Sequence, residues 1–216
     1  RAIGFTTHNQ DLAEEAARSS LFSTIQYPLN YLSSDRDDSW IRACSDCNIG
    51  IIAMKPFAGG MIRDAELTFA YFRSREAVVP IYGIQRLSEL QVLLELEANP
   101  PVMDALMQQR IRQNQKLLQP LFCRGCDRCA SACPQGIRPG YMGRIGDFLY
   151  RNRTDLYLTA AWHQEVEKIT SCTQCGRCVQ ICPNGCDLRK KMQESRAVFL
   201  DHWQRRQFKK LEINGP

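Results

Sequence analysis

Apolar residues in the first hundred positions alternate between short continuous runs and stretches with a helical period, which predicts strands alternating with helices. Four such pairs follow one another, and this order is typical of a parallel sheet with right-handed crossovers. The run at 50–54 is apolar throughout, as expected for a strand buried on both faces. The predicted strands are 2–6, 23–29, 50–54 and 78–82, and the predicted helices are 11–19, 39–47, 65–75 and 87–98. Asp37 and Asp38 are expected to cap the second helix.

The second half of the chain has helical patterns without strand signals. The pair Pro100 and Pro101 marks a boundary, because paired prolines stop the preceding helix. An amphipathic stretch at 102–118 predicts a linker helix that packs against the sheet. Further helices are predicted at 143–150, 160–169 and 188–210. The expected domains are therefore 1–100, a linker at 101–119, and a helical domain at 120–216.

Eight of the eleven cysteines form two runs with the spacing C-x2-C-x2-C-x3-C-P. This is the spacing of bacterial ferredoxins, in which each run holds a [4Fe–4S] cluster and the fourth cysteine ligates the other cluster. The proline after the fourth cysteine disfavours helical backbone there and leads the chain away from the loop. We therefore predict two clusters. The predicted ligands are Cys123, Cys126, Cys129 and Cys182 for one cluster, and Cys172, Cys175, Cys178 and Cys133 for the other.

Other uses of these cysteines explain the pattern less well. A zinc ribbon needs two C-x2-C pairs and would leave four of the eight thiols without a role. A disulfide framework would oxidise the thiols, whereas clusters need them reduced. A c-type haem site would need C-x-x-C-H, which the sequence lacks. The remaining cysteines, Cys44, Cys47 and Cys186, are expected to pack in the core.

Composition limits the remaining function classes. A length of 216 residues suits two ordinary domains, and no run of 18 apolar residues predicts membrane insertion. The formal charge of +5 includes basic runs at 189–191 and 205–210, which are expected to be solvated helix faces. No nucleic-acid-binding module accompanies them, so we expect no nucleic-acid partner. The chain begins with Arg1 directly before a predicted strand, which suggests a fragment of a longer protein.

Four segments resemble the fifth to eighth strands of aldo/keto reductases, specifically of predicted oxidoreductases that carry a C-terminal two-cluster ferredoxin domain. They are 3–8 (IGFTTH), 24–30 (TIQYPLN), 50–60 (GIIAMKPFAGG) and 79–83 (VPIYG). The resemblance implies a mixed α/β fold, namely the C-terminal half of a (β/α)8 barrel of the TIM type, with four βα units, followed by an α-helical ferredoxin-like domain. It also implies a cytoplasmic protein. The family's catalytic residues lie on the first four strands, so no catalytic residue is expected in this chain.

The resemblance also implies where a nicotinamide cofactor, NADH or NADPH, would lie. Thr6, Thr7 and Gln26 match the positions that hold the nicotinamide amide. Met54 replaces the aromatic residue that stacks on the ring, and Lys55 follows it. The positions that hold the adenosine end correspond to Glu89, Val92 and Leu93, which differ from the family pattern. His8 is the only titratable residue near this site, and a loop histidine is the simpler interpretation.

Two functions follow from this reading. The first is an iron–sulfur oxidoreductase that moves electrons between its clusters and a barrel-bound nicotinamide or small-molecule substrate, with a redox partner protein. The second is a non-catalytic ferredoxin-like carrier or structural module that docks on a partner subunit. Cationic side chains near the clusters are expected to raise the reduction potential, because positive charge stabilises the reduced form. The candidates are Arg124, Arg128, Arg138 and Arg177.

Overall fold

The computed structural model describes residues 2–151 and 154–213. The chain divides into two compact units, Arg1–Arg124 and Gly125–Pro216. We call the first the sheet unit and the second the helical unit, and we describe each by itself.

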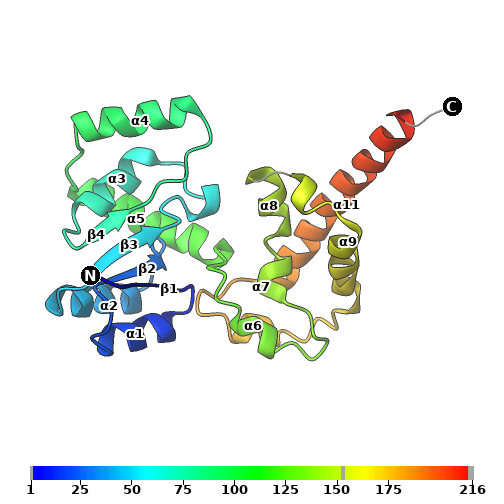
Figure 1. Ribbon diagram of the computed structural model, residues 1–216, viewed down its shortest axis with the longest axis horizontal. Helices are drawn as coiled ribbons and strands as arrows, with labels where there is room; N and C mark the ends of the chain where they lie inside the picture. The colour runs from blue at the N-terminus through cyan, green and yellow to red at the C-terminus, as the bar shows by residue number, and fades with distance from the viewer. Residues whose placement is uncertain (1, 152–153, 214–216) are drawn as a thin grey trace. The chain divides into compact units, whose positions relative to one another are not determined.

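The sheet unit contains a parallel four-stranded sheet whose strands follow chain order (Figure 1). The strands are β1 (Gly4–Thr6), β2 (Thr24–Pro28), β3 (Gly50–Met54) and β4 (Val78–Pro80). The register places Ile25 opposite Phe5 on one side and Ile51 on the other, and Ile51 opposite Val78. Each of the four predicted strands is present, although β1 and β4 are shorter than their apolar runs.

Helices connect the strands, as the alternating pattern predicts. They are α1 (Gln10–Arg18), α2 (Asp35–Asp46), α3 (Ala65–Arg73) and α4 (Leu87–Ala98), with a 3₁₀ turn, η1, at Ala58–Gly60. Helix α2 begins four residues before its predicted start, so the prediction that Asp37 and Asp38 precede it is wrong. Ser34 is the N-cap residue, and its backbone N–H donates to the carboxylate of Asp37 over 2.7 Å. This hydrogen bond satisfies a donor at the helix start and stabilises the first turn.

One face of the sheet is buried and the other is partly exposed. Ile25, Tyr27, Ile51 and Ala53 join residues of α1, α2 and α3 in the core of the unit. The alternate positions on β2 and β3 are half-buried, and Val79 on β4 is 62% exposed. The prediction that 50–54 is buried on both faces is therefore wrong. An uninterrupted apolar run does not distinguish a strand covered on two faces from one covered on a single face.

Helix α5 (Ala105–Leu118) packs against the core of the sheet unit, of which it is part. It begins three residues later than predicted, where the side chain of Asp104 accepts a hydrogen bond from the backbone N–H of Met107. Gln115 donates to the carbonyl of Tyr31, and Arg110 forms an ion pair with Asp64. A 3₁₀ turn, η2 (Gln119–Leu121), ends the helix just before the first cysteine run.

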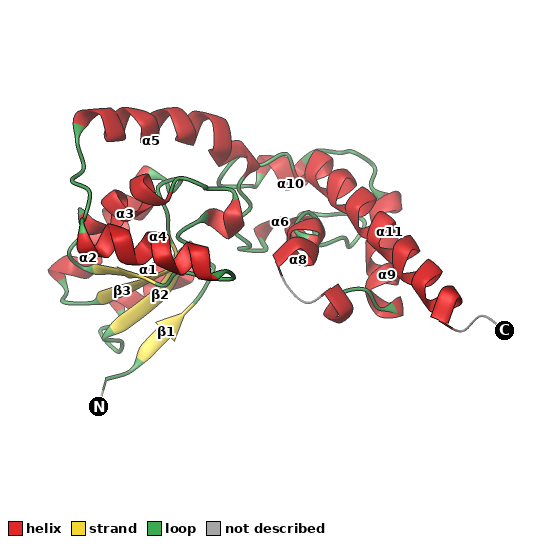
Figure 2. Ribbon diagram, turned by 90° about the horizontal axis from the view of Figure 1, so that it is seen from above, coloured by secondary structure: helices red, strands yellow, loops and turns green. Residues whose placement is uncertain are grey.

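In the helical unit, most of the short helices pack on one long helix, α11 (Leu188–Ile213), and α6 packs on α7 and α10 (Figures 1 and 2). The short helices are α6 (Arg128–Ser131), α7 (Pro139–Met142), α8 (Ile145–Arg151), α9 (Ala160–Glu167) and α10 (Arg177–Gln180), with 3₁₀ turns η3 (Thr154–Leu156) and η4 (Lys168–Ser171). The single helix predicted at 143–150 is in fact α8, preceded by the separate short helix α7. Gly143 lies between them, and its carbonyl accepts a hydrogen bond from the Ser195 hydroxyl of α11.

The core of the helical unit is rich in aromatic side chains. Phe199 of α11 is fully buried beside Ile145 and Ile169. Tyr141 stacks on Trp162, with ring centroids 5.4 Å apart. Cys133 and Cys172, both partly buried, pack against this core. Among the described residues, no helix has the length and apolar character needed to cross a membrane.

Candidate iron–sulfur centre

The two cysteine loops share the same unusual backbone conformation. In the second loop, Gln174 and Gly176 have φ angles of 57° and 78°, in the left-handed region. In the first loop, Gly125 and Asp127 stand at the equivalent positions, with φ angles of 83° and 61°. Left-handed residues on either side of the central cysteine tighten each loop, and a short helix follows directly. The repeated spacing in the sequence therefore produces a repeated local structure.

Cys133, the last cysteine of the first run, lies with the second loop. It lines one pocket together with Cys172, Cys175 and Cys178, and Pro134, Pro139, Gly176 and Met192 complete most of the wall. The pocket contains about 300 Å³ of space that protein atoms leave open, including its solvent side. Among the described residues, no group of three His, Cys, Asp or Glu side chains is placed to hold a single metal ion.

The thiols of this pocket differ in their surroundings. Cys175 is exposed, and the backbone N–H of Arg177 hydrogen-bonds its sulfur and lowers the pKa of the thiol. Cys178 is buried, and burial raises the pKa of that thiol, with the neighbouring Cys172 adding to the effect. Metal ligation needs the thiolate form. The loop thus holds one thiol whose anion is favoured by hydrogen bonding and one whose anion is disfavoured by burial.

A cationic side chain borders the pocket. Arg189 of α11 is one of its lining residues, and its guanidinium donates to the carbonyl of Gln174 over 3.5 Å. Its Nε also pairs with Asp187 over 3.3 Å. The sequence pattern predicted only a solvated basic run at 189–191, because nothing local distinguishes Arg189 from Lys190. The structure places its guanidinium beside the second cysteine loop.

The part of the first loop that belongs to the helical unit contacts backbone and guanidinium groups of that unit. The backbone N–H of Gly140 donates to the sulfur of Cys129 over 3.1 Å. The guanidinium of Arg144 lies against Gly125 so closely that a Cβ atom there would be 2.7 Å from its Nη1. Helices α6 and α10, which follow the two loops, contact each other. The loop segments with Cys129 and Cys178 therefore lie side by side, as two neighbouring clusters would require.

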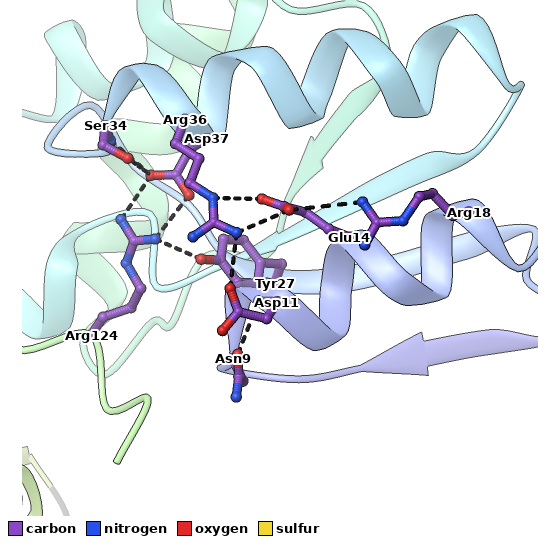
Figure 3. Close-up of polar contacts among 9 residues, drawn as sticks. All are labelled: Asn9, Asp11, Glu14, Arg18, Tyr27, Ser34, Arg36, Asp37 and Arg124. Atoms are coloured by element: carbon purple, nitrogen blue, oxygen red, sulfur yellow. Dashed lines mark hydrogen bonds and ion pairs between the residues drawn. The ribbon is translucent and has the colours of Figure 1, made fainter. Parts of the chain in front are cut away.

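Arg124 does not act as the simple cation that its place in the first run suggested. Its guanidinium forms two hydrogen bonds of 2.8 Å with the carboxylate of Asp37, and a third of 2.5 Å with the hydroxyl of Tyr27 (Figure 3). Burial alone would lower the pKa of Arg124, but the hydrogen bonds to Asp37 outweigh it and raise that pKa. The charge of Asp37 balances that of Arg124, so Arg124 contributes little net positive charge. Arg138 is likewise paired with Asp127.

Of the residues expected to hold a nicotinamide, Thr6 ends β1 and Met54 ends β3, whereas Gln26 is the middle residue of β2. Thr6 is the register neighbour of Gln26, and both belong to the partly exposed face of the sheet. The hydroxyl of Thr7 accepts a hydrogen bond from the backbone N–H of Asn9, so it helps to start α1. Met54 ends β3 and is half-buried.

Lys55 follows β3 in a left-handed conformation, with φ of 57°. Its ammonium donates to the carbonyl of Arg124 over 3.3 Å, and its own carbonyl accepts from the side-chain amide of Asn30. Sequence reasoning placed Lys55 only beside a cofactor, and it missed this contact between segments 69 residues apart. Glu89 binds Arg86 and the backbone of Gln85 at the start of α4, which gives it a local structural role.

Residues 115–183 match the family model of the 4Fe-4S dicluster domain. The matched range begins before Cys123 and ends after Cys182, so it covers both cysteine runs in full. The chain therefore carries a ferredoxin-type iron–sulfur domain, and the prediction of iron–sulfur chemistry is confirmed. Searches of curated proteins and of solved structures gave no match. None of these comparisons supports the resemblance of the first hundred residues to aldo/keto reductases.

Proposed function

We propose that this chain is an iron–sulfur oxidoreductase that carries two [4Fe–4S] clusters with crossed ligation. The observation behind this proposal is the pocket that Cys133 shares with the second cysteine loop. Because the fourth cysteine of each run ligates the other cluster in two-cluster ferredoxins, these four thiols fit one cluster. The remaining set, Cys123, Cys126, Cys129 and Cys182, is the proposed ligand set of the other.

The donors suit the group they would hold. Thiolates are the usual ligands of iron–sulfur clusters, and each loop has left-handed residues on either side of its central cysteine. Arg189 lies at the edge of the pocket, with its charge partly balanced by Asp187. When bound, such clusters supply one-electron transfer, so the two electrons of one hydride would need both of them, with the proton released to solvent.

We further propose that the sheet unit is the C-terminal half of a (β/α)8 barrel. Four parallel strands in chain order, with helices packed on one face, support this interpretation. In such barrels the carboxyl ends of the strands bind the substrate. Thr6 and Met54 lie at those ends and Gln26 is the register neighbour of Thr6, so a nicotinamide cofactor or a small-molecule substrate is proposed to bind there. A redox partner protein would exchange electrons with the clusters.

Serine variants of single cysteines test the ligand sets. The full chain is reconstituted anaerobically with iron and sulfide, and two clusters would give about eight irons per chain. Cys133→Ser and Cys172→Ser should remove the same electron paramagnetic resonance signal, whereas Cys129→Ser should remove the other. Cys186→Ser is the matched control, because that thiol is buried outside both runs. If Cys133→Ser and Cys129→Ser removed the same signal, crossed ligation would be rejected, and colourless protein with bound zinc would reject the clusters themselves.

Calorimetric titration with NADH and with NADPH tests the nicotinamide proposal. The wild-type chain should bind at least one of them, and Gln26→Leu should weaken that binding because it removes the amide partner. Gln113→Leu, an exposed position on α5, is the control and should bind like the wild type. Absence of binding to both nucleotides would reject the nicotinamide proposal and leave the iron–sulfur proposal unaffected.

A further inference from the structure

Cys123 lies between two residues that are anchored in the sheet unit. Phe122, before it, is buried in the core of that unit. Arg124, after it, is buried and paired with Asp37, with side-chain exposures of 4% and 0%. Both neighbours of this cysteine are therefore fixed by packing and by charge.

Arg124 is held at its backbone as well as at its side chain. The side chain reaches Asp37 on α2 and Tyr27 on β2 (Figure 3). The backbone carbonyl accepts the hydrogen bond from the Lys55 ammonium at the end of β3. Residues from α2, from β2 and from the position directly after β3 thus hold the residue next to Cys123.

Stability alone gives little reason for this ion pair. Moving two charges out of water costs free energy, and a buried pair can often be replaced by apolar residues of similar size without loss. What apolar residues cannot reproduce is the orientation that two parallel hydrogen bonds between guanidinium and carboxylate impose. Such a pair of hydrogen bonds fixes the position of the neighbouring backbone.

We propose that Asp37, acting through Arg124, is a positioning residue for the cluster ligand Cys123. The inference rests on the proposed function, since it takes Cys123 as a ligand. The pair fixes the backbone next to Cys123, and the Lys55 ammonium, bonded to the Arg124 carbonyl, adds positive charge there. The retention of iron by this cluster and its reduction potential thus depend on Asp37 of α2 and on Lys55 after β3, neither of which is a cluster ligand.

The test replaces the ion pair by apolar residues in the full reconstituted chain. In Asp37→Leu/Arg124→Met, we expect one of the two clusters to lose iron to a chelator about 10- to 100-fold faster, as when outer-shell partners of metal sites are removed. The midpoint potential of that cluster should shift in a titration followed by paramagnetic resonance, while the other cluster keeps its potential. Asp64→Leu/Arg110→Met is the matched control, because it removes another ion pair of the sheet unit. Both clusters should be unchanged in the control.

Wild-type iron retention and potentials in the apolar double variant would overturn the inference. If that variant does not fold, Lys55→Met takes its place, since it keeps the buried pair and removes the ammonium. One cluster potential should then fall, and two unchanged potentials would overturn the inference. Cys123→Ser separates the two proposals. If Cys123→Ser loses one cluster but Asp37→Leu/Arg124→Met behaves like the wild type, only the positioning role is rejected. If Cys123→Ser keeps all its iron, the proposed ligand set is rejected.

Discussion

Breaking the ion pair between Asp37 and Arg124 should destabilise the sheet unit strongly. Asp37→Asn leaves the Arg124 guanidinium charged and buried with a neutral partner. Because the two side chains are 0% and 4% exposed, solvent does not screen this charge. Removal of one partner of a buried pair typically costs about 3–5 kcal/mol. For a domain whose unfolding free energy is about 5–15 kcal/mol, this is a large fraction of the total.

Urea denaturation of the full chain measures this effect. Trp40 reports on the sheet unit, because its ring lies 5.0 Å from that of Tyr27, at the ion pair. The other tryptophans, Trp162 and Trp203, belong to the helical unit, and phenylalanine at both positions isolates the Trp40 signal. A loss of about 4 kcal/mol with a slope of about 2 kcal/mol per molar would lower the urea midpoint by about 2 M.

The control is an ion pair of the same unit that is open to solvent. Arg36 pairs with Asp11 over 2.8 Å, with exposures of 48% and 54%. Asp11→Asn should cost no more than about 1 kcal/mol, because water screens exposed pairs. If Asp37→Asn cost as little as Asp11→Asn, the reasoning from burial would be refuted. The apolar double variant Asp37→Leu/Arg124→Met should recover most of the stability that the single change loses.

Three further outcomes are expected. Phe199→Ala should destabilise the helical unit by about 3–5 kcal/mol in circular-dichroism melts, because it leaves a cavity at a fully buried site. Tyr150→Ala, at a position that is 73% exposed, should change stability by less than about 0.5 kcal/mol. Similar losses in the two variants would contradict the buried position of Phe199. Chelation of iron should reduce amide-exchange protection in Gly125–Pro216 more than in Arg1–Arg124, because Cys133 and Cys172 pack against the core of the helical unit. An equal loss of protection in both units would contradict this coupling between the clusters and the helical core. Burial raises the pKa of Cys44 to about 11, so the folded state holds this proton more tightly than the unfolded state. The free energy of unfolding measured in urea should therefore fall from about pH 9 to pH 11, and it should fall less steeply in Cys44→Ala. The same pH dependence in both proteins would refute the raised pKa of Cys44.

Local patterns predicted the elements well because their causes are local. The strand at 50–54 is recognised by five successive apolar residues, and β3 has the same bounds. The cysteine loops are the clearest case, since spacing alone predicted iron–sulfur chemistry and the matching family model confirms it. Element ends were less accurate. The start of α2 depends on the hydrogen bond between Ser34 and Asp37, which competes with the acidic signal of Asp38.

Contacts between distant segments could not be read from these patterns. Nothing near Arg124 in the sequence indicates Asp37, which is 87 residues away. Likewise, no feature of the basic run at 189–191 marks its first residue, Arg189, as part of the wall of the cysteine pocket. The covered face of the sheet was also unpredictable, because β3 is apolar on both sides.

The order of residues along the chain was enough to place the strands and helices to within a few residues and to predict the iron–sulfur domain. These features depend on side chains within about one turn or one loop of each other, where backbone propensity and spacing act directly. Packing of the folded chain decided that Cys133 lies with the second loop, that Arg124 is neutralised by Asp37, and that Lys55 reaches the residue after Cys123. Each of these contacts joins segments far apart in the chain, so it exists only once burial has brought them together.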